Sequence, residues 1–448
     1  MLVPRDMKGQ TIGVLGLGRS GLAAVAALKA AGAHVFAYDD VKSPQDVNQI
    51  TFTRWCDWPW EELDAMVISP GIPHNYPMPH PAAAHAHRQQ IPIISEVELA
   101  LRAKPKARLV AITGTNGKST TTALMGHCLQ TAECPFAIGG NLGDAACSLD
   151  DPGEHGTLVL ELSSYQLETT PSLKPSISIL LNISPDHLDR HGGMAGYIAA
   201  KTRVLDRLDK SGIAIIGAGD EHVQTLAKLT AAKGIKTLIA SPDLAPIGQK
   251  GSTALAGIHN AENAAAAALA LHAIGLDDQV INRGISSFTN LPHRLQRVAS
   301  CGKVQFINDS KATNGIAAAK ALAALSDIYW VAGGLAKHDG LSPTMPYLGA
   351  VKKAYLIGTA APTFATSLSG ICPVAIFNDL EQATRAAFDD ASADPGGGTI
   401  LLAPAAASFD QFPNFGARGD AFTALAHDLC ATGYAKQNDN SIRRDNHA

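Results

Sequence analysis

The stretch VAITGTNGKSTTTALM, residues 110–125, joins an apolar run to a Gly-rich turn and then to residues typical of a helix. Gly114 and Gly117 frame the turn, and Lys118 follows directly. Backbone N–H groups of such a turn cradle phosphate, the lysine reaches the β- and γ-phosphate oxygens, and a following hydroxyl can bind Mg²⁺. The strict Walker spacing is not met, because Ile112 stands five positions before Gly117. We interpret the stretch as a strand, a nucleotide-phosphate loop and a helix of an α/β domain.

A second Gly-rich turn stands near the N-terminus, in VLGLGRSGLAA (residues 14–24). Its glycines form the pattern G-x-G-x-x-G from Gly16 to Gly21, and Asp39 follows at the end of the next expected strand. This pattern is typical of a dinucleotide site, in which the acid meets a ribose. Three interpretations stay open: an NAD site, a site for another nucleotide such as UDP, or a tight turn without a ligand. The ATP-type chemistry of the remaining sequence disfavours NAD.

Composition restricts the class of protein. The 448 residues carry a net charge of −4 without a basic run, so we expect no general nucleic-acid binding. Seven cysteines without a C-x-x-C pair predict free thiols in a reducing cytoplasm, with no disulfide framework and no zinc site. No signal peptide is evident, and the longest apolar stretch, residues 263–276, is too short to span a bilayer. We expect a cytoplasmic monomer.

Short β-branched runs alternate with Ala- and Leu-rich helical patterns along the whole chain. This alternation predicts an α/β protein with parallel sheets. We expect a Rossmann-like domain over residues 1–95 and a central P-loop ATPase-type domain, with a parallel or mixed sheet, over 96–298. A C-terminal Rossmann-like domain over 299–436 and an irregular polar tail over 437–448 complete the prediction.

Polar residues follow several of the predicted strands. Glu161 ends an apolar strand beside the phosphate loop, where a carboxylate can bind Mg²⁺, whereas Glu168 is expected on a helix surface. His187 lies in the polar turn of ILLNISPDHLDRH and is either a structural histidine or a ligand. Lys201 lies on a helical pattern, and the residues alone indicate a solvated lysine.

Further polar clusters lie toward the C-terminus. Asn260 and Asn263 share one helix face, where they could bind a nucleotide or cap the helix, and Arg294 could meet phosphates. Three later strand-end loops, INDSKATN, VAGGLAKHDG and APAAASFDQFPNFGARG, carry lysines, hydroxyl groups and acids. Because the carboxyl ends of parallel strands meet at one sheet edge, these loops predict an anion-binding edge.

Seven stretches together resemble the Mur ligase family: AITGTNGKST, LELSSYQLE, LNISPDHLDRH, HNAEN, LPHRLQ, NDSKATN and SFDQFPNFGARG. The resemblance runs from about residue 11 to about residue 430. LELSSYQL and NDSKATN are similar to the member of the family that adds D-glutamate. The family's phosphate loop is G-T-N-G-K-[ST], so the missing Walker glycine is expected in it.

The resemblance implies an ATP-dependent acid–amino-acid ligase of peptidoglycan precursor synthesis. Its substrates would be UDP-N-acetylmuramoyl-L-alanine and D-glutamate. The alanine carboxylate would attack the γ-phosphate of ATP, and the D-glutamate amine would displace phosphate from the resulting acyl phosphate. The resemblance also implies Mg²⁺, as two ions with Mn²⁺ as a substitute, and a carbamylated lysine at Lys201. A carbamate requires a neutral amine, so the lysine pKa must be depressed.

The resemblance assigns roles position by position. Catalytic roles would fall to Lys118, Glu161, His187 and Lys201, and the metal ligands would be Ser119, Glu161, His187 and Lys201 as its carbamate. ATP would be bound by Gly114, Thr115, Asn116, Gly117, Lys118, Ser119, Thr120, Asn260, Asn263, Arg294 and Asp309. The UDP substrate would be bound by Gly18, Arg19, Ser20, Asp39, Asp40, Ser69, Gly71, Asn141 and His187. D-Glutamate would be bound by Lys311, Thr313, Lys337, Ser408 and Phe415.

Other functions stay open at this point. A sister ligase would add another amino acid, including L-glutamate, to the same kind of acceptor. An NAD(P)-dependent oxidoreductase would use the first Gly-rich turn, although no hydride-transfer constellation accompanies it. A nucleotide-regulated binding protein would need neither Glu161 nor His187, and both are present.

Overall fold

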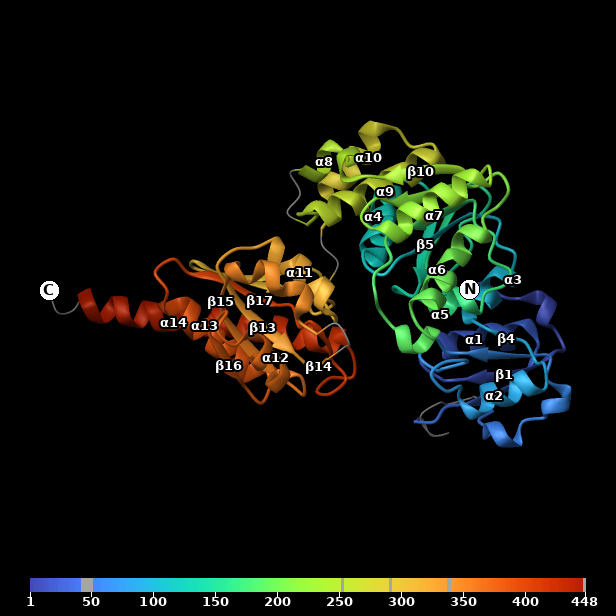
Figure 1. Cartoon of the computed structure of the whole chain (residues 1–448), viewed down its shortest axis with the longest axis horizontal. Coiled ribbons are helices and arrows are strands. Elements are labelled where there is room, and N and C mark those ends of the chain that lie inside the picture. The colour runs from blue at the N-terminus through green and yellow to red at the C-terminus, as the bar shows by residue number, and fades with distance from the viewer. Residues whose placement is uncertain (42–50, 251–253, 290–291, 337–339, 446–448) are drawn as a thin grey trace. The chain divides into compact units, whose positions relative to one another are not determined.

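The computed structural model describes residues 1–41, 51–250, 254–289, 292–336 and 340–445 (Figure 1). The chain divides into two compact units, which we describe separately. One unit holds Met1–Ser252 with Ile258–Phe288, and the other holds Thr253–Gly257 with Thr289–Ala448. The described residues form a four-stranded and a six-stranded sheet in the first unit, and a six-stranded sheet with a two-stranded ribbon in the second. The α/β prediction is confirmed.

The first sheet has four parallel strands in the order β2-β1-β3-β4. Its strands are β1 (Thr11–Leu15), β2 (His34–Tyr38), β3 (Ala65–Ile68) and β4 (Ile93–Ile94), and its helices are α1 (Arg19–Ala31) and α2 (Pro81–Arg88). All four residues of β3 are buried, as expected for a parallel strand covered on both faces. The Gly-rich turn between β1 and α1 lies at the carboxyl end of this sheet.

The second sheet has six parallel strands in the order β10-β9-β8-β5-β7-β6. They are β5 (Arg108–Thr113), β6 (Phe136–Gly140), β7 (Thr157–Glu161), β8 (Ile177–Leu180), β9 (Ile213–Gly217) and β10 (Lys236–Ala240). Its helices are α4 (Lys118–Thr131), α5 (Ser164–Glu168), α6 (Met194–Asp206), α7 (Glu221–Ala232), α8 (Ile247–Lys250), α9 (Ile258–Ile274) and α10 (Asp278–Ser287). The phosphate-loop strand β5 lies between β8 and β7, so their carboxyl ends flank the loop.

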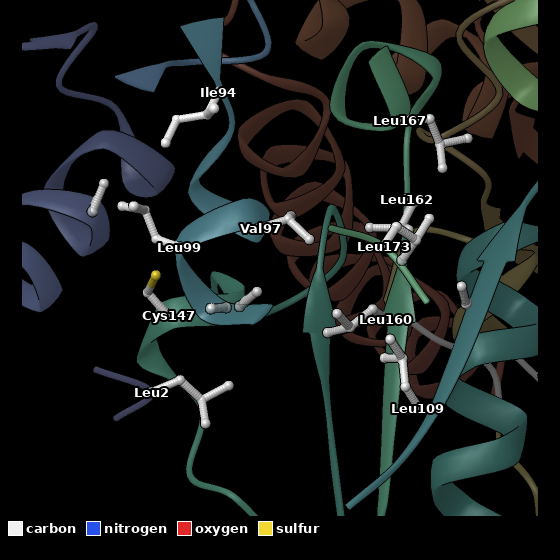
Figure 2. Packing of buried hydrophobic residues seen from close by; sticks show 14 of the residues in the cluster. Leu2, Ile94, Val97, Leu99, Leu109, Cys147, Leu160, Leu162, Leu167 and Leu173 are labelled. Carbon is white, nitrogen blue, oxygen red and sulfur yellow. The ribbon is translucent and has the colours of Figure 1, made fainter. Parts of the chain in front are cut away.

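One hydrophobic core is shared by the first two sheets (Figure 2). Helix α3 (Glu96–Arg102) contributes Val97 and Leu99, which belong to the same buried cluster as Leu2 near the N-terminus and Leu160 on β7. The first two sheets are therefore packed into a single body, although the sequence predicts a domain boundary near residue 95.

The third sheet lies in the second unit, in the order β11-β12-β17-β13-β15-β16. Strand β11 is antiparallel to β12, and the remaining neighbours are parallel. The strands are β11 (Gln296–Cys301), β12 (Val304–Asn308), β13 (Ile328–Gly333), β15 (Val351–Ile357), β16 (Val374–Ile376) and β17 (Gly398–Leu402), and β14 (Leu335–Ala336) pairs with β18 (Ala406–Ala407) as the ribbon. The helices are α11 (Gly315–Ala323), α12 (Ala361–Leu368), α13 (Leu380–Ala393) and α14 (Phe415–Asp445).

One element differs from the sequence-based expectations, and two strands carry only a weak signal in the sequence. The Gly-rich run of β6 and the polar run of β11 lack a clear β pattern. Helix α14 continues to Asp445, into the segment predicted to be irregular. No helix among the described residues is long and apolar enough to cross a membrane.

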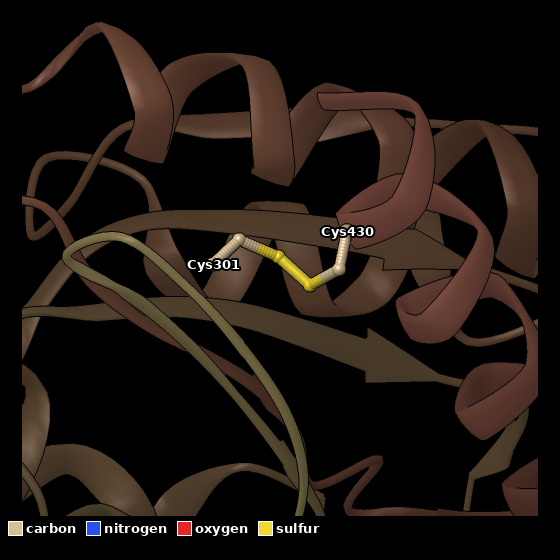
Figure 3. Close-up of a disulfide and its surroundings, with 2 residues drawn as sticks. All are labelled: Cys301 and Cys430. Atoms are coloured by element: carbon tan, nitrogen blue, oxygen red, sulfur yellow. A yellow bond between two sulfur atoms is a disulfide. The ribbon is translucent and has the colours of Figure 1, made fainter. Parts of the chain in front are cut away.

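The prediction of free thiols throughout is wrong for one pair of cysteines. Cys301 at the end of β11 forms a disulfide with Cys430 on α14 (Figure 3). The pairing joins residues 129 positions apart, so neither a short motif nor local spacing could reveal it. The other five cysteines, Cys56, Cys128, Cys134, Cys147 and Cys372, are free.

Candidate active site

The phosphate loop lies between β5 and α4, and its glycines are required by the backbone. Gly117 precedes α4 at φ 85°, in the left-handed region that favours glycine. A Cβ atom on Gly117 would lie 2.3 Å from Oδ1 of Asn263, so the amide of α9 packs directly on the loop. Asn260, one helical turn earlier, accepts a hydrogen bond from Asn263 Nδ2 at 3.2 Å. The two asparagines predicted to bind ATP therefore lie beside the phosphate loop.

Asn182, which follows β8, holds the loop in shape. Its side-chain oxygen accepts from the Asn116 N–H at 2.9 Å, and its amide donates to the Asn116 carbonyl at 3.0 Å. The Asn182 carbonyl also accepts from the Thr115 N–H at 2.9 Å. The segment that follows the neighbouring strand β8 thus braces the loop.

Two lysines converge on this loop. Lys118 Nζ donates to the carbonyls of Gly114 and Thr115 at 2.9 and 2.8 Å, and Lys201 Nζ donates to the same Gly114 carbonyl at 2.7 Å. Lys201 is 1% exposed and lies over the Tyr197 ring at 4.7 Å from its centroid. Burial, followed by the charge of Lys118, holds the pKa of Lys201 well below its usual range. The interpretation of Lys201 as a solvated lysine is wrong.

Glu161 is buried at the carboxyl end of β7. Its Oε1 accepts from Asn141 Nδ2 at 2.7 Å, and its backbone carbonyl accepts from the Asn141 N–H at 2.9 Å. The Asn141 carbonyl in turn accepts from Arg19 of the first Gly-rich turn at 3.3 Å. This chain of contacts connects the first predicted nucleotide turn to the strand end beside the second.

His187 lies in the turn after β8 with a left-handed backbone at φ 53°. Its ring is 42% exposed, its centroid lies 5.4 Å from that of the Tyr165 ring, and its Nε2 lies 3.5 Å from the Asp186 carboxylate. Within the described ranges, no group of three or more His, Cys, Asp or Glu side chains is placed to hold a metal ion. A metal at this edge would need the Ser119 hydroxyl, a modified lysine or substrate oxygens among its ligands.

Three residues predicted to bind the UDP substrate contact other groups of the protein. Asp39 accepts from the Leu17 N–H at 2.6 Å, so its carboxylate supports the Gly-rich turn itself. The Ser69 hydroxyl donates to the Gly16 carbonyl at 3.0 Å, and Asp40 pairs with His80 at 3.0 Å. A nucleotide ribose would meet a carboxylate that already has a partner.

In the second unit, Asp309 follows β12 and is buried. Burial raises the pKa of its carboxyl to about 7, against the opposing effects of a hydrogen bond from the Leu295 N–H and the charge of Arg294. Both predicted ATP residues of this unit therefore interact with each other electrostatically.

The predicted D-glutamate residues lie on loops of the second unit. Lys311 Nζ lies 3.9 Å from the centroid of the Phe415 ring, a cation–π distance. The Thr313 N–H donates to the Lys311 carbonyl at 2.7 Å, and Ser408 is buried after β18. Lys337 lies outside the described residues.

Sequence reasoning missed Arg418, which organises these loops. This buried guanidinium donates to the Ser310 carbonyl and hydroxyl at 2.9 and 3.0 Å, to the Gly333 carbonyl at 3.4 Å and to the Ala406 carbonyl at 3.2 Å. Ser310 follows β12, Gly333 is the last residue of β13, and Ala406 is on β18, which follows β17. Strands β12, β17 and β13 are neighbours in the sheet. The predicted meeting of the three loops is confirmed, and the arginine in FGARG is its centre.

Comparison with known proteins bears on both units. A family model for the Mur ligase middle domain matches residues 112–245, and one for the Mur ligase glutamate ligase domain matches residues 293–406. A UDP-N-acetylmuramoylalanine–D-glutamate ligase of Rhodospirillum rubrum is 42% identical over 459 residues, which cover 95% of this chain and 96% of the relative. The chain belongs to the Mur ligase family.

Other relatives of this Mur ligase are similar to it over nearly the whole chain. Ligases of the same description from Caulobacter vibrioides and Rhizobium meliloti are 40% and 42% identical, covering 97% and 94% of this chain and 99% and 97% of the relatives. The Thermotoga maritima structures of UDP-N-acetylmuramate-alanine ligase MurC and of MurF ligase with ADP each have a TM-score of 0.59, at 17% and 15% identity. The matches cover 94% and 96% of this chain, and 99% and 97% of the MurC and MurF chains respectively. They confirm the fold.

Proposed function

We propose that this Mur ligase joins D-glutamate to UDP-N-acetylmuramoyl-L-alanine at the expense of ATP in peptidoglycan precursor synthesis. The products are UDP-N-acetylmuramoyl-L-alanyl-D-glutamate, ADP and phosphate. The observation that carries the proposal is the identity of 40–42% over nearly the whole chain to ligases of that description. Membership of the family implies the use of ATP.

The chemistry requires activation, because a carboxylate is a poor electrophile. The alanine carboxylate attacks the γ-phosphorus of ATP and releases ADP, and the D-glutamate amine then attacks the acyl carbon and expels phosphate. Lys118 and the N–H groups of residues 114–120 neutralise the transferring phosphoryl group. We assign Asn260 and Asn263, which lie beside the loop, to the rest of ATP. We also assign Arg294 and Asp309 to ATP.

Magnesium fits the donors of the central sheet edge. The Ser119 hydroxyl and the Glu161 carboxylate, both buried oxygens, are ligands of the type that Mg²⁺ prefers. We assign the first ion to them and a second to His187 with Lys201, and Mn²⁺ could replace either ion. When bound, the ions neutralise negative charge on the phosphates. Glu161 is held in place by Asn141, which also contacts the muramoyl substrate in this proposal.

Lys201 fits the requirement for carbamylation. Its amine is buried and its pKa is depressed, so a neutral nitrogen is available to add to CO₂. The amine forms a bond to the carbon of CO₂ and releases a proton, so the product is a carbamate anion. Its negative charge would attract Lys118, and its oxygens would be available as metal ligands.

The substrate sites follow the remaining assignments. We place the uridine and muramoyl parts against Gly18, Arg19, Ser20, Asp39, Asp40, Ser69, Gly71, Asn141 and His187. We place D-glutamate against Lys311, Thr313, Lys337, Ser408 and Phe415. We retain three functional domains, 1–95, 96–298 and 299–436, with a tail over 437–448, and a monomer in the cytoplasm.

Phosphate release tests the proposal. Purified protein with ATP, Mg²⁺, bicarbonate and UDP-N-acetylmuramoyl-L-alanine should release phosphate with D-glutamate and not with L-glutamate, L-lysine or meso-diaminopimelate. Release only with another amino acid would identify a sister ligase. Absence of release in folded protein would overturn the proposal and direct attention to NAD binding at the first Gly-rich turn.

A further inference from the structure

Glu168, predicted to lie on a helix surface, is 15% exposed at the end of α5. Its Oε2 lies 3.5 Å from His74 Nε2, and its Oε1 lies 3.4 Å from His191 Nδ1. His74 comes from the loop after β3 in the first sheet, and His191 ends the 3₁₀ turn η6 (Leu188–His191) after β8 in the second. One carboxylate thus lies between imidazoles from two different sheets of the first unit.

His191 has a defined hydrogen-bonding arrangement. Its Nε2 lies 2.9 Å from the Ser164 hydroxyl, and its Nδ1 faces Glu168. A ring that donates from Nδ1 to the carboxylate and accepts the Ser164 proton at Nε2 satisfies both contacts. Glu168 therefore orients a fully buried ring.

The His191 ring connects this carboxylate to the phosphate loop. It stacks on Tyr165 with ring centroids 5.1 Å apart and an interplanar angle of 10°, and it contacts Tyr197 at 5.3 Å. The Tyr197 hydroxyl lies 3.1 Å from the Thr115 hydroxyl, and the Tyr197 ring lies under Lys201. The contacts run without interruption from Glu168 to the loop proposed to hold ATP.

A second set of contacts fastens the same turn to the first sheet. Arg190 donates to the Gly71 carbonyl at 2.9 Å and lies 4.6 Å from the centroid of the Tyr165 ring. His87 Nε2 lies 2.8 Å from the His74 carbonyl and anchors the loop that carries His74. The turn bearing His187 is thereby held against the loop bearing Ser69 and Gly71.

We propose that Glu168 is a positioning residue of the ligase reaction. Because its carboxylate lies between two imidazoles, it holds the His187 turn and the Gly71–His74 loop in one fixed arrangement. The inference rests on the proposed function, since these two segments carry residues assigned to the metal and to the UDP substrate. Glu168 itself is assigned no contact with substrate.

The test compares Glu168→Ala and Glu168→Gln with Glu98→Gln in the full chain. Glu98 is a matched control, because it is more deeply buried in the same unit and binds Arg102 at 2.9 Å and Ser172 at 2.6 Å. We expect Glu168→Ala to lower kcat/KM for the UDP substrate by about 10- to 100-fold, as for other residues that orient ligands. Glu168→Gln should recover part of this loss, and KM for D-glutamate should stay unchanged. Glu98→Gln should lower Tm without changing these constants.

Amide hydrogen exchange gives a readout independent of turnover. Exchange of residues 187–193 should be faster in Glu168→Ala than in wild type and unchanged in Glu98→Gln. Unchanged exchange, or faster exchange with unchanged kcat/KM, would overturn the inference. If wild-type protein releases no phosphate, the proposed function fails, and the exchange data together with the Kd of the UDP substrate decide the positioning role.

Discussion

Lys118 and Lys201 donate hydrogen bonds to the same carbonyl oxygen, that of Gly114. Two ammonium groups close together repel each other, and burial disfavours the charged form of Lys201. Lys201, the more deeply buried, responds with a lowered pKa. The arrangement therefore favours the neutral form of Lys201.

Lys201→Ala should therefore lower the rate of phosphate release by about 100-fold or more, a loss typical of a removed electrostatic stabiliser. Added acetate or formate should restore part of the activity by supplying the missing carboxylate. The measurement is the initial rate with and without roughly 0.1 M carboxylate, a concentration that fills a weak site. Full activity of the unrescued variant would remove Lys201 from the mechanism.

Gly117→Ala should weaken ATP binding by about tenfold or more, because the new Cβ displaces Asn263. Gly153→Ala is the matched control, since Gly153 has the same φ of 85° and a Cβ added there would meet no heavy atom within 4 Å. The free energy of unfolding should fall by about 1–2 kcal/mol in both variants, because alanine is strained in the left-handed backbone conformation. Calorimetric titration with an ATP analogue should show a weaker affinity for Gly117→Ala than for Gly153→Ala. Equal affinities of the two variants would contradict the packing role of Asn263.

The buried Glu96 carboxyl should make stability depend on pH. Burial raises its pKa to about 7, despite a hydrogen bond from the Cys147 N–H. The folded state then binds a proton more tightly than the unfolded state, so this contribution is fully present below about pH 4.5 and is lost as the pH rises to about 7.

Glu96→Gln removes that titration while keeping an acceptor for Cys147. Denaturant unfolding should show that the variant gains stability relative to wild type between about pH 5 and about pH 8, by about 3 kcal/mol at most. A constant difference across this range would show that Glu96 titrates normally.

Reduction of the Cys301–Cys430 disulfide should destabilise the second unit by about 2–4 kcal/mol, because the bond closes a long loop. Denaturant midpoints with and without a phosphine reductant provide the comparison, and Cys301→Ser should match the reduced protein. Thiol titration of denatured oxidised protein should give five thiols, against seven after reduction. Seven thiols without reductant would contradict the disulfide.

The sequence predicted the elements whose signals are local. Glycine spacing located both nucleotide turns, and the apolar runs before them located their strands. Burial depends on packing between distant segments, so Lys201 and Glu168 were misread as surface residues. Helical periodicity shows which residues share a face and does not show what covers that face.

Arg418 illustrates a different limit. Its neighbours in the chain gave no sign that it would be buried, because its carbonyl acceptors lie at or beyond the ends of three separate strands. Only the strand order β12-β17-β13 brings those carbonyls together. Roles that depend on sheet order were therefore beyond reach of motif reasoning, although the meeting of the loops was predicted.

The two Gly-rich turns follow strands of two sheets that share one hydrophobic core. A fragment that starts near residue 95 would lack the side chains of the first sheet that pack against Val97 and Leu99. It would therefore expose a hydrophobic surface to water and would be prone to aggregate. The turn assigned to UDP and the turn assigned to ATP are therefore supported by one common core. A change that loosens this core should disturb both turns.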